Sequence, residues 1–179
     1  MTERLYQHDS YLQTFSAQVV GVEEEGVYLD RTAFFPSGGG VVGDLGTLTS
    51  ADGTVLSVTE TTDREGRVWH RLDGSPPALG TAVQGELDWA RRFLLMRYHT
   101  ACHVLTGVMF TDYKVRVTGC QLTPEKGRVD FAFEQFDRAL LEQGFERANG
   151  IIGDDRAVTI SFLPAEEAQG RPELFKLET

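Results

Sequence analysis

Residues 88–110 read DWARRFLLMRYHTACHVLTGVMF, and this stretch divides the chain into two parts of different character. It runs for 23 residues without a proline, and its large apolar residues recur at helical intervals: Trp89, Phe93, Met96 and Leu105. Such spacing predicts a helix. Asp88, directly before the first of these residues, is placed to cap its start.

Upstream of this helix the sequence is typical of β-structure. Short segments rich in branched and aromatic residues alternate with turns such as EEEG and DGSPPALG, which is the pattern of a small barrel or sandwich. The expected strands are 15–22, 27–35, 47–50, 54–60, 67–72 and 82–89. We therefore predict a β-rich domain carrying a glycine motif at about 1–87.

Downstream, helices and strands are mixed. The expected elements are a strand pair at 114–122 and 128–134, a helix at 136–150 that ends at Asn149-Gly150, a strand at 157–163 and a short helix at 164–170. The predicted fold class is α+β: a small barrel-like domain followed, at about 88–179, by an α/β core with helices on an antiparallel sheet.

Composition bounds the class of protein. A hydrophobic content of 41% with 25% charged residues is ordinary for a packed globular chain. No apolar run approaches the roughly 20 residues of a membrane span, and the polar start MTERLYQHDSYLQ does not resemble a secretory signal. Two cysteines form no disulfide framework. A cytoplasmic location is expected.

Charge is unevenly distributed along the chain. The net charge is −10, yet residues 91–128 hold seven Lys or Arg and two Asp or Glu, a local charge of +5. A basic middle in an acidic protein suits a small anion site better than a long duplex footprint, because phosphate contacts dominate nucleic-acid affinity. Chance clustering on a solvated helix is the alternative.

The segment His99-Thr-Ala-Cys-His103 is the sharpest local feature. Residues four apart on a helix lie one turn above each other, so both imidazoles can reach one metal ion. Zincin peptidases share this spacing but need a Glu after the first His, and Thr100 stands there. Two histidines merely packing on a helix face are the other interpretation.

A second feature is the glycine-rich segment TAFFPSGGGVVGDLG at 32–46. Gly38, Gly39 and Gly40 remove side chains from a stretch of loop and so allow a ligand to approach the backbone. No Gly-Lys-Ser/Thr follows and no helix opens here, which excludes a P-loop and a Rossmann fingerprint. A tight connection between barrel strands is the alternative.

Together these motifs resemble the alanyl-tRNA synthetase editing domains and their free-standing AlaX relatives. The glycine segment 32–46 looks like the family's glycine-rich motif, and RYHTACHVL at 97–105 is similar to its first zinc motif. The segments VTGCQL at 117–122 and GRVDF at 127–131 resemble the strand pair that follows. The order and separations agree along nearly the whole chain.

The resemblance implies an enzyme that hydrolyses mischarged tRNA for alanine, chiefly its seryl and also its glycyl ester. It implies zinc as the cofactor, with His99 and His103 as metal ligands. Gly38, Gly39, Gly40 and Thr118 become substrate-binding positions. The acceptor end of that tRNA is the implied partner, with neither DNA nor a membrane, and the candidate contacts are Arg91, Arg92, Arg97, Lys114 and Arg116. The resemblance assigns no catalytic residue.

The chain departs from the family pattern at two places. Val41 and Val42 stand where the family normally has Gln and Pro, and valine offers no hydrogen bond to a substrate. The family's second metal motif, a Cys or Asp followed by two small residues, Thr and His, does not occur before Thr179. The core is therefore expected to be incomplete at its C-terminus.

Three interpretations stay open: a truncated chain, a local third ligand such as Cys120, or a shortened relative that binds the tRNA acceptor end, or a partner protein, without hydrolysis. A metal-dependent hydrolase of small acyl substrates is a further alternative, against which the basic segment counts mildly. No Ser-His-Asp arrangement is visible, so any hydrolysis should proceed without a covalent intermediate.

Overall fold

The computed structural model describes residues 1–171 and divides into two compact units. The barrel unit comprises Met1–Met96 and Thr123–Glu125. The helical unit comprises Arg97–Leu122 and the chain from Lys126 onward. Within residues 1–171, no helix combines the length and the apolar character that crossing a membrane requires.

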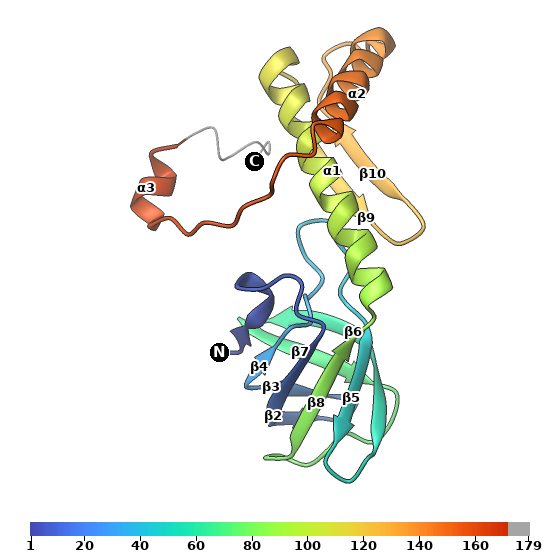
Figure 1. Ribbon diagram of the computed structural model, residues 1–179, viewed down its shortest axis with the longest axis vertical. Coiled ribbons are helices and arrows are strands. Elements are labelled where there is room, and N and C mark those ends of the chain that lie inside the picture. The colour runs from blue at the N-terminus through green and yellow to red at the C-terminus, as the bar shows by residue number, and fades with distance from the viewer. Residues whose placement is uncertain (172–179) are drawn as a thin grey trace. The chain divides into compact units, whose positions relative to one another are not determined.

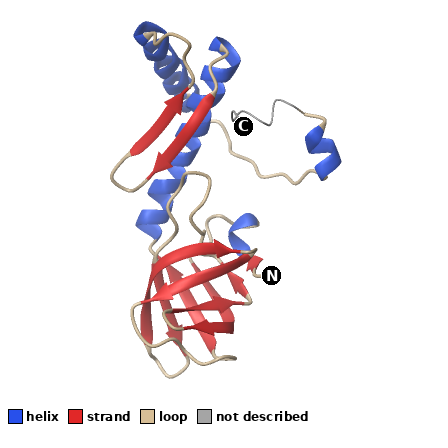
Figure 2. Cartoon of the chain, turned by 180° about the vertical axis from the view of Figure 1, so that it is seen from behind, coloured by secondary structure: helices blue, strands red, loops and turns tan. Residues whose placement is uncertain are grey.

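Six antiparallel strands close into a barrel in the order β2, β3, β7, β6, β5, β8, and β8 pairs back onto β2 (Figures 1 and 2). Their bounds are β2 Thr14–Glu23, β3 Gly26–Leu29, β5 Gly46–Ser50, β6 Val55–Arg64, β7 Arg67–Leu72 and β8 Ala82–Leu87. Outside the barrel, the two-residue β1 (Glu3–Arg4) pairs in parallel with β4 (Arg31–Thr32), and the 3-10 helix η1 covers Leu5–Gln7. The predicted β-rich domain is a barrel, and closure excludes the sandwich.

Alternation of side chains builds the interior of the barrel. Along β2, Phe15, Ala17 and Val19 are buried while the residues between them are exposed, and β8 alternates in the same way. This period of two is what a sheet with one buried face requires. The largest fully buried side chains of the barrel unit include Phe34, Leu29, Leu48, Val58 and His70.

The helix predicted around residues 88–110 is α1, Trp89–Tyr113. It begins in the barrel unit and continues into the helical unit. Asp88 caps it as expected, since its Oδ1 accepts the Arg91 amide at 3.1 Å. The helix ends at Tyr113. The next residue, Lys114, has a left-handed φ of 60°, and the Val115 amide donates to the Met109 carbonyl at 3.0 Å, a typical helix-ending pattern.

In the helical unit, β9 (Val117–Leu122) and β10 (Gly127–Phe131) form an antiparallel pair, and α2 (Arg138–Gly153) packs with α1. Asp137 caps α2 by accepting the Leu140 amide at 3.0 Å. Gly144 permits the close approach of the two helices, because a Cβ there would lie 2.4 Å from the Met109 sulfur. The short α3 covers Ala165–Gln169.

Two expectations about the downstream part are wrong. The helix predicted to end at Asn149-Gly150 continues to Gly153, because Ile151 still packs on the core. The strand predicted at 157–163 is absent: the segment forms no ladder within the described residues, and Val158 and Ile160 are 78% and 58% exposed. Strand-like alternation forms no strand without a neighbouring strand to pair with.

Candidate metal centre

The two histidines of α1 turn their rings towards one another. The Nε2 atoms of His99 and His103 lie 3.1 Å apart, and the ring centroids lie 4.7 Å apart. Both rings leave the same face of α1, as their spacing predicts. Burial, followed by the neighbouring His103, lowers the pKa of His99, which favours the neutral imidazole that a metal ion requires.

This geometry fits zinc, the group that the resemblance implies. Two imidazole nitrogens held by one tetrahedral zinc at about 2.0–2.1 Å are separated by about 3.3 Å, close to the separation of the two Nε2 atoms. Across residues 1–171, no group of three His, Cys, Asp or Glu side chains that could hold a metal is found. The described chain therefore offers two ligands, whereas catalytic zinc usually has three from protein.

Cys120 lies against the other cysteine of the chain. The Sγ atoms of Cys102 and Cys120 are 3.4 Å apart, which places β9 beside α1 within one turn of both histidines. Burial, and then the Cys120 thiol, raises the pKa of Cys102 to about 12. Since Cys120 joins no metal-binding group of the described residues, the suggestion that it completes the ligand set finds no support.

Thr118 occupies an irregular position in β9. Gly119 is paired with Asp130 and Val117 with Phe131, so Thr118 is the extra residue of a β-bulge. Its side chain is exposed. Bulges re-aim single side chains and are frequent beside active sites, and Thr118 stands two residues from Cys120.

The glycine segment forms a tight turn within the barrel unit. Gly38 and Val41 exchange both backbone hydrogen bonds at 3.0 Å, and Gly39 and Gly40 between them have φ of 59° and 82°. Two positive φ values are those of a type I′ turn, which glycine adopts without strain. Val41, where the family has Gln, is only 7% exposed, so its side chain points into the protein.

A buried ion pair, which the sequence interpretation did not foresee, anchors this segment. The Nε atom of Arg92 donates to Asp44 Oδ2 at 2.9 Å, and its Nη2 donates to the Ala33 carbonyl at 2.6 Å. The same Asp44 oxygen accepts the Phe35 amide at 2.6 Å. Arg91 donates to the Gly43 carbonyl at 3.2 Å. The sequence features that could have indicated this ion pair are the consecutive Arg91-Arg92 and Asp44 of the glycine segment.

The candidate tRNA contacts therefore divide. Arg92 is only 5% exposed, and its Nε and Nη2 atoms donate to Asp44 and to the Ala33 carbonyl. Its burial contradicts the prediction that it contacts tRNA, and these bonds hold the glycine segment in place. Arg91 is half-buried, and Arg97, Lys114 and Arg116 are exposed. Lys114 also ends α1, where its ammonium group donates to the Thr111 carbonyl at 2.9 Å.

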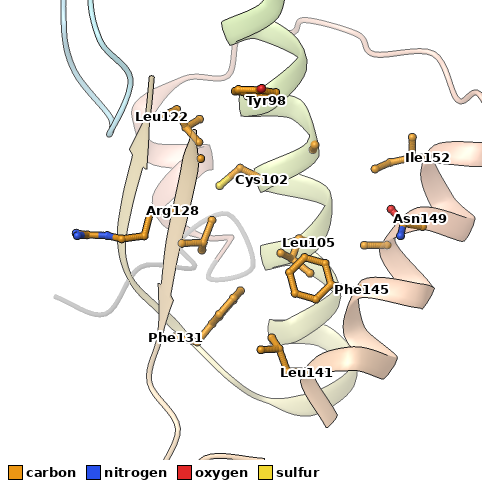
Figure 3. A pocket seen from close by; sticks show the side chains of 14 residues that line it. Tyr98, Cys102, Leu105, Leu122, Arg128, Phe131, Leu141, Phe145, Asn149 and Ile152 are labelled. Carbon is orange, nitrogen blue, oxygen red and sulfur yellow. The ribbon is translucent and has the colours of Figure 1, made fainter. Parts of the chain in front are cut away.

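The helical unit also contains an open apolar pocket of about 640 Å³ between α1, the strand pair and α2 (Figure 3). Cys102 points into it from α1, Leu122 and Phe131 come from the strands, and Leu141 comes from α2. The pocket could not be predicted from the sequence. Hydrophobic periodicity shows which face of an element is apolar, but not where the helices and the strand pair leave a space between them.

Comparison with known proteins places these motifs in a family. Residues 7–91 match the family model for class II (A) tRNA synthetases. The AlaX-M alanyl-tRNA editing protein of Saccharolobus solfataricus is 40% identical over 179 residues, covering 99% of this chain and 75% of that protein. The AlaX-M protein of Methanosarcina mazei is 37% identical, covering 96% and 71%.

A longer relative shows the same similarity over one segment. The alanine–tRNA ligase of Ignicoccus hospitalis is 38% identical over 176 residues, which cover 95% of this chain and 19% of the ligase. The free-standing proteins, by contrast, match across most of their own length. With its barrel, its histidine helix and this similarity, the chain belongs to the AlaX-M family of alanyl-tRNA editing proteins.

Proposed function

We propose that this chain hydrolyses the ester of mischarged tRNA for alanine, chiefly the seryl and also the glycyl form. Its AlaX-M relatives are alanyl-tRNA editing proteins by name. The single observation that carries the proposal is the convergence of the His99 and His103 Nε2 atoms to 3.1 Å on α1. A pair that merely packed on a helix face would not need its metal-binding nitrogens to meet.

The chemistry assigned to each side chain follows from its surroundings. His99 and His103 would hold the metal through imidazole nitrogens, and zinc bound there would supply a Lewis acid for water or for the terminal ribose. Neither cysteine has an assigned general base, and Cys102 is a poor nucleophile for the ester. Cys102 is buried with its pKa raised to about 12, so its reactive thiolate is scarce near neutral pH. The proposed hydrolysis therefore has no covalent intermediate.

Thr118 in the helical unit and the glycine turn in the barrel unit are each proposed to contact the substrate. The exposed hydroxyl on the β9 bulge is assigned to the serine hydroxyl of the substrate, because a site that hydrogen-bonds a hydroxyl discriminates strongly against an analogue lacking it. Gly38, Gly39 and Gly40 offer backbone without side chains, and a Cβ placed on Gly39 would meet no atom within 4 Å. Thr118→Val should lower the preference for seryl over alanyl ester, and Thr118→Ser should retain it.

The proposed contacts to the tRNA backbone are Arg91, Arg97, Lys114 and Arg116. Each phosphate contact that is lost should reduce the slope of log affinity against log salt by about 0.7–0.9. Arg116→Gln should therefore weaken tRNA binding at low salt more than at high salt. Glu146→Gln, which removes an exposed negative charge from α2, is the control: it should not weaken tRNA binding at low salt.

The decisive assay is deacylation of seryl- and alanyl-tRNA for alanine, with added zinc and with chelator. Rapid loss of serine, slow loss of alanine and abolition by chelator or by His103→Ala would support the proposal. His8→Ala, an exposed histidine outside α1, is the matched control and should leave the rate unchanged. Persistence of the rate in His103→Ala would refute the metal assignment.

Two observations favour a second candidate, a protein that grips the tRNA acceptor end without hydrolysis. The described residues supply only two metal ligands, and Val41 offers no amide. This candidate predicts tRNA binding that survives chelation, with no deacylation above the spontaneous rate at any zinc concentration.

A further inference from the structure

Cys102 and Cys120 are the only cysteines of the chain, and the fold brings them into contact. Cys102 lies on α1 and Cys120 lies on β9, 18 residues later. Their Sγ atoms are 3.4 Å apart, whereas the sulfurs of a disulfide are 2.03–2.05 Å apart. Bond formation therefore requires the two sulfurs to approach by only about 1.4 Å.

The two thiols differ in their access to solvent. Cys102 is 8% exposed and faces the apolar pocket, whereas Cys120 is half-buried. Cys120 is therefore the more exposed thiol, and Cys102, at 3.4 Å, is the thiol placed to react with an oxidised Cys120. A partly accessible sulfur beside a second thiol is one feature that sites of reversible oxidation share.

We propose that Cys102 and Cys120 are an oxidative modification site, which an oxidant of the hydroperoxide class converts into an intramolecular disulfide between α1 and β9. Hydrogen peroxide first transfers one oxygen to Cys120, giving a sulfenic acid and water. The Cys102 sulfur, held at 3.4 Å, then attacks the Cys120 sulfur, the S–O bond breaks, and the hydroxyl leaves as water with the Cys102 thiol proton. This second step is slow near neutral pH, because little of Cys102 is thiolate. Two thiols lose two electrons and two protons, and one peroxide becomes two waters.

The disulfide would tighten α1 against β9 beside the metal-binding histidines. Cys102 directly precedes His103 and lies three residues after His99, one helical turn away, so a disulfide at Cys102 would constrain the turn that carries both histidines. This consequence rests on the metal site proposed above. By analogy with changes next to metal ligands, the loss of metal affinity should be about tenfold.

The test uses the full chain, reduced and then treated with stoichiometric hydrogen peroxide before any metal is added. The expected product is a monomer whose intact mass is lower by two hydrogens, which has lost both maleimide-reactive thiols and which dithiothreitol restores. Cys120→Ser and Cys102→Ser are matched controls that cannot form the bond. A product that mainly gains oxygen atoms, or that is a disulfide-linked dimer, would overturn the modification site.

Binding of Co(II) to the reduced and oxidised chains, followed by its absorption spectrum, tests the consequence for the histidines. A roughly tenfold weaker affinity after oxidation, absent in Cys120→Ser, is the expected result. Equal affinities would overturn the link to the histidine pair. A reduced chain that takes up no Co(II) would overturn the metal site itself, and the mass measurement, which needs neither metal nor tRNA, tells this failure apart.

Discussion

Removing the guanidinium of Arg92 should destabilise the barrel unit severely. Asp44 and Arg92 are 3% and 5% exposed, and Arg92→Met leaves the carboxylate buried without its counter-ion and the Ala33 carbonyl without its donor. Breaking one side of a buried ion pair costs about 3–5 kcal/mol, which is a large part of the 5–15 kcal/mol by which domains are stable. With a urea dependence near 1.5 kcal/mol per molar, the unfolding midpoint should fall by roughly 2–3 M.

Tryptophan fluorescence makes this assay specific for the barrel unit. The chain has two tryptophans, Trp69 on β7 and Trp89 at the start of α1, and both belong to that unit. Arg91→Met makes the same change one residue earlier, where the guanidinium gives a single 3.2 Å bond to the Gly43 carbonyl. This control should lose about 1 kcal/mol.

The loss caused by Arg92→Met should also depend on pH. Burial raises the pKa of Asp44, while the Arg92 charge and the Phe35 amide act to lower it. Without Arg92 the folded-state pKa rises further, so the folded protein binds the Asp44 proton more tightly than the unfolded chain. The penalty is then small below the ordinary pKa of 3.8, grows as pH rises, and is complete above the raised pKa. The variant should lose more stability near pH 7 than near pH 5.

A double variant gives the sharpest test. In Asp44→Asn combined with Arg92→Met no charge is left buried, so the pair should lose less stability than the two single variants added together. Strict additivity, a loss no larger than that of Arg91→Met, or the same loss at both pH values would refute the reasoning.

Three further predictions concern single positions. His70 is fully buried, and burial lowers its pKa to about 4. Because the unfolded chain binds the His70 proton more tightly, about 3 kcal/mol of folding stability should be lost as pH falls from 6.5 to 4. His70→Gln should flatten this pH dependence of stability in urea titrations. Gly40→Ala should cost about 1–2 kcal/mol because its φ is 82°, whereas Gly39→Asn, which creates the Asn-Gly pair favoured in type I′ turns, should change the melting temperature by under about 2 °C. Asp137→Ala removes the cap that accepts the Leu140 amide and should cost about 1 kcal/mol, seen as faster amide exchange in the first turn of α2.

The elements that local pattern determines could be predicted from the sequence. Alternation in 15–22 and 82–89 became β2 and β8, and the proline-free stretch after Asp88 became α1. The histidine spacing likewise predicted converging rings, because helix geometry alone brings residues four apart to one face. The metal, the substrate contacts and the domain limits drawn at 87 and 88 stay predictions.

The remaining differences come from partners distant in sequence. Arg92 is buried because Asp44 and the Ala33 carbonyl, more than 40 residues earlier, meet it inside the barrel unit, and no composition count shows such a meeting. The segment 157–163 has the alternation of a strand but forms no ladder in the described structure. Strand propensity indicates only that a segment is compatible with a sheet. Whether the segment forms a strand depends on a neighbouring strand with which it can pair.

The pairing of β8 with β2 has a consequence for synthesis of the chain on the ribosome. Thr14 of β2 is opposite Glu86 of β8. One edge of β2, the first barrel strand to be synthesised, therefore stays unpaired until β8, the last barrel strand, has been made. At about 5–20 residues per second, the chain between Glu23 and Ala82 takes roughly 3–12 s to make. During that interval the nascent chain carries an uncovered strand edge rich in valine, the period in which a chaperone would protect it most.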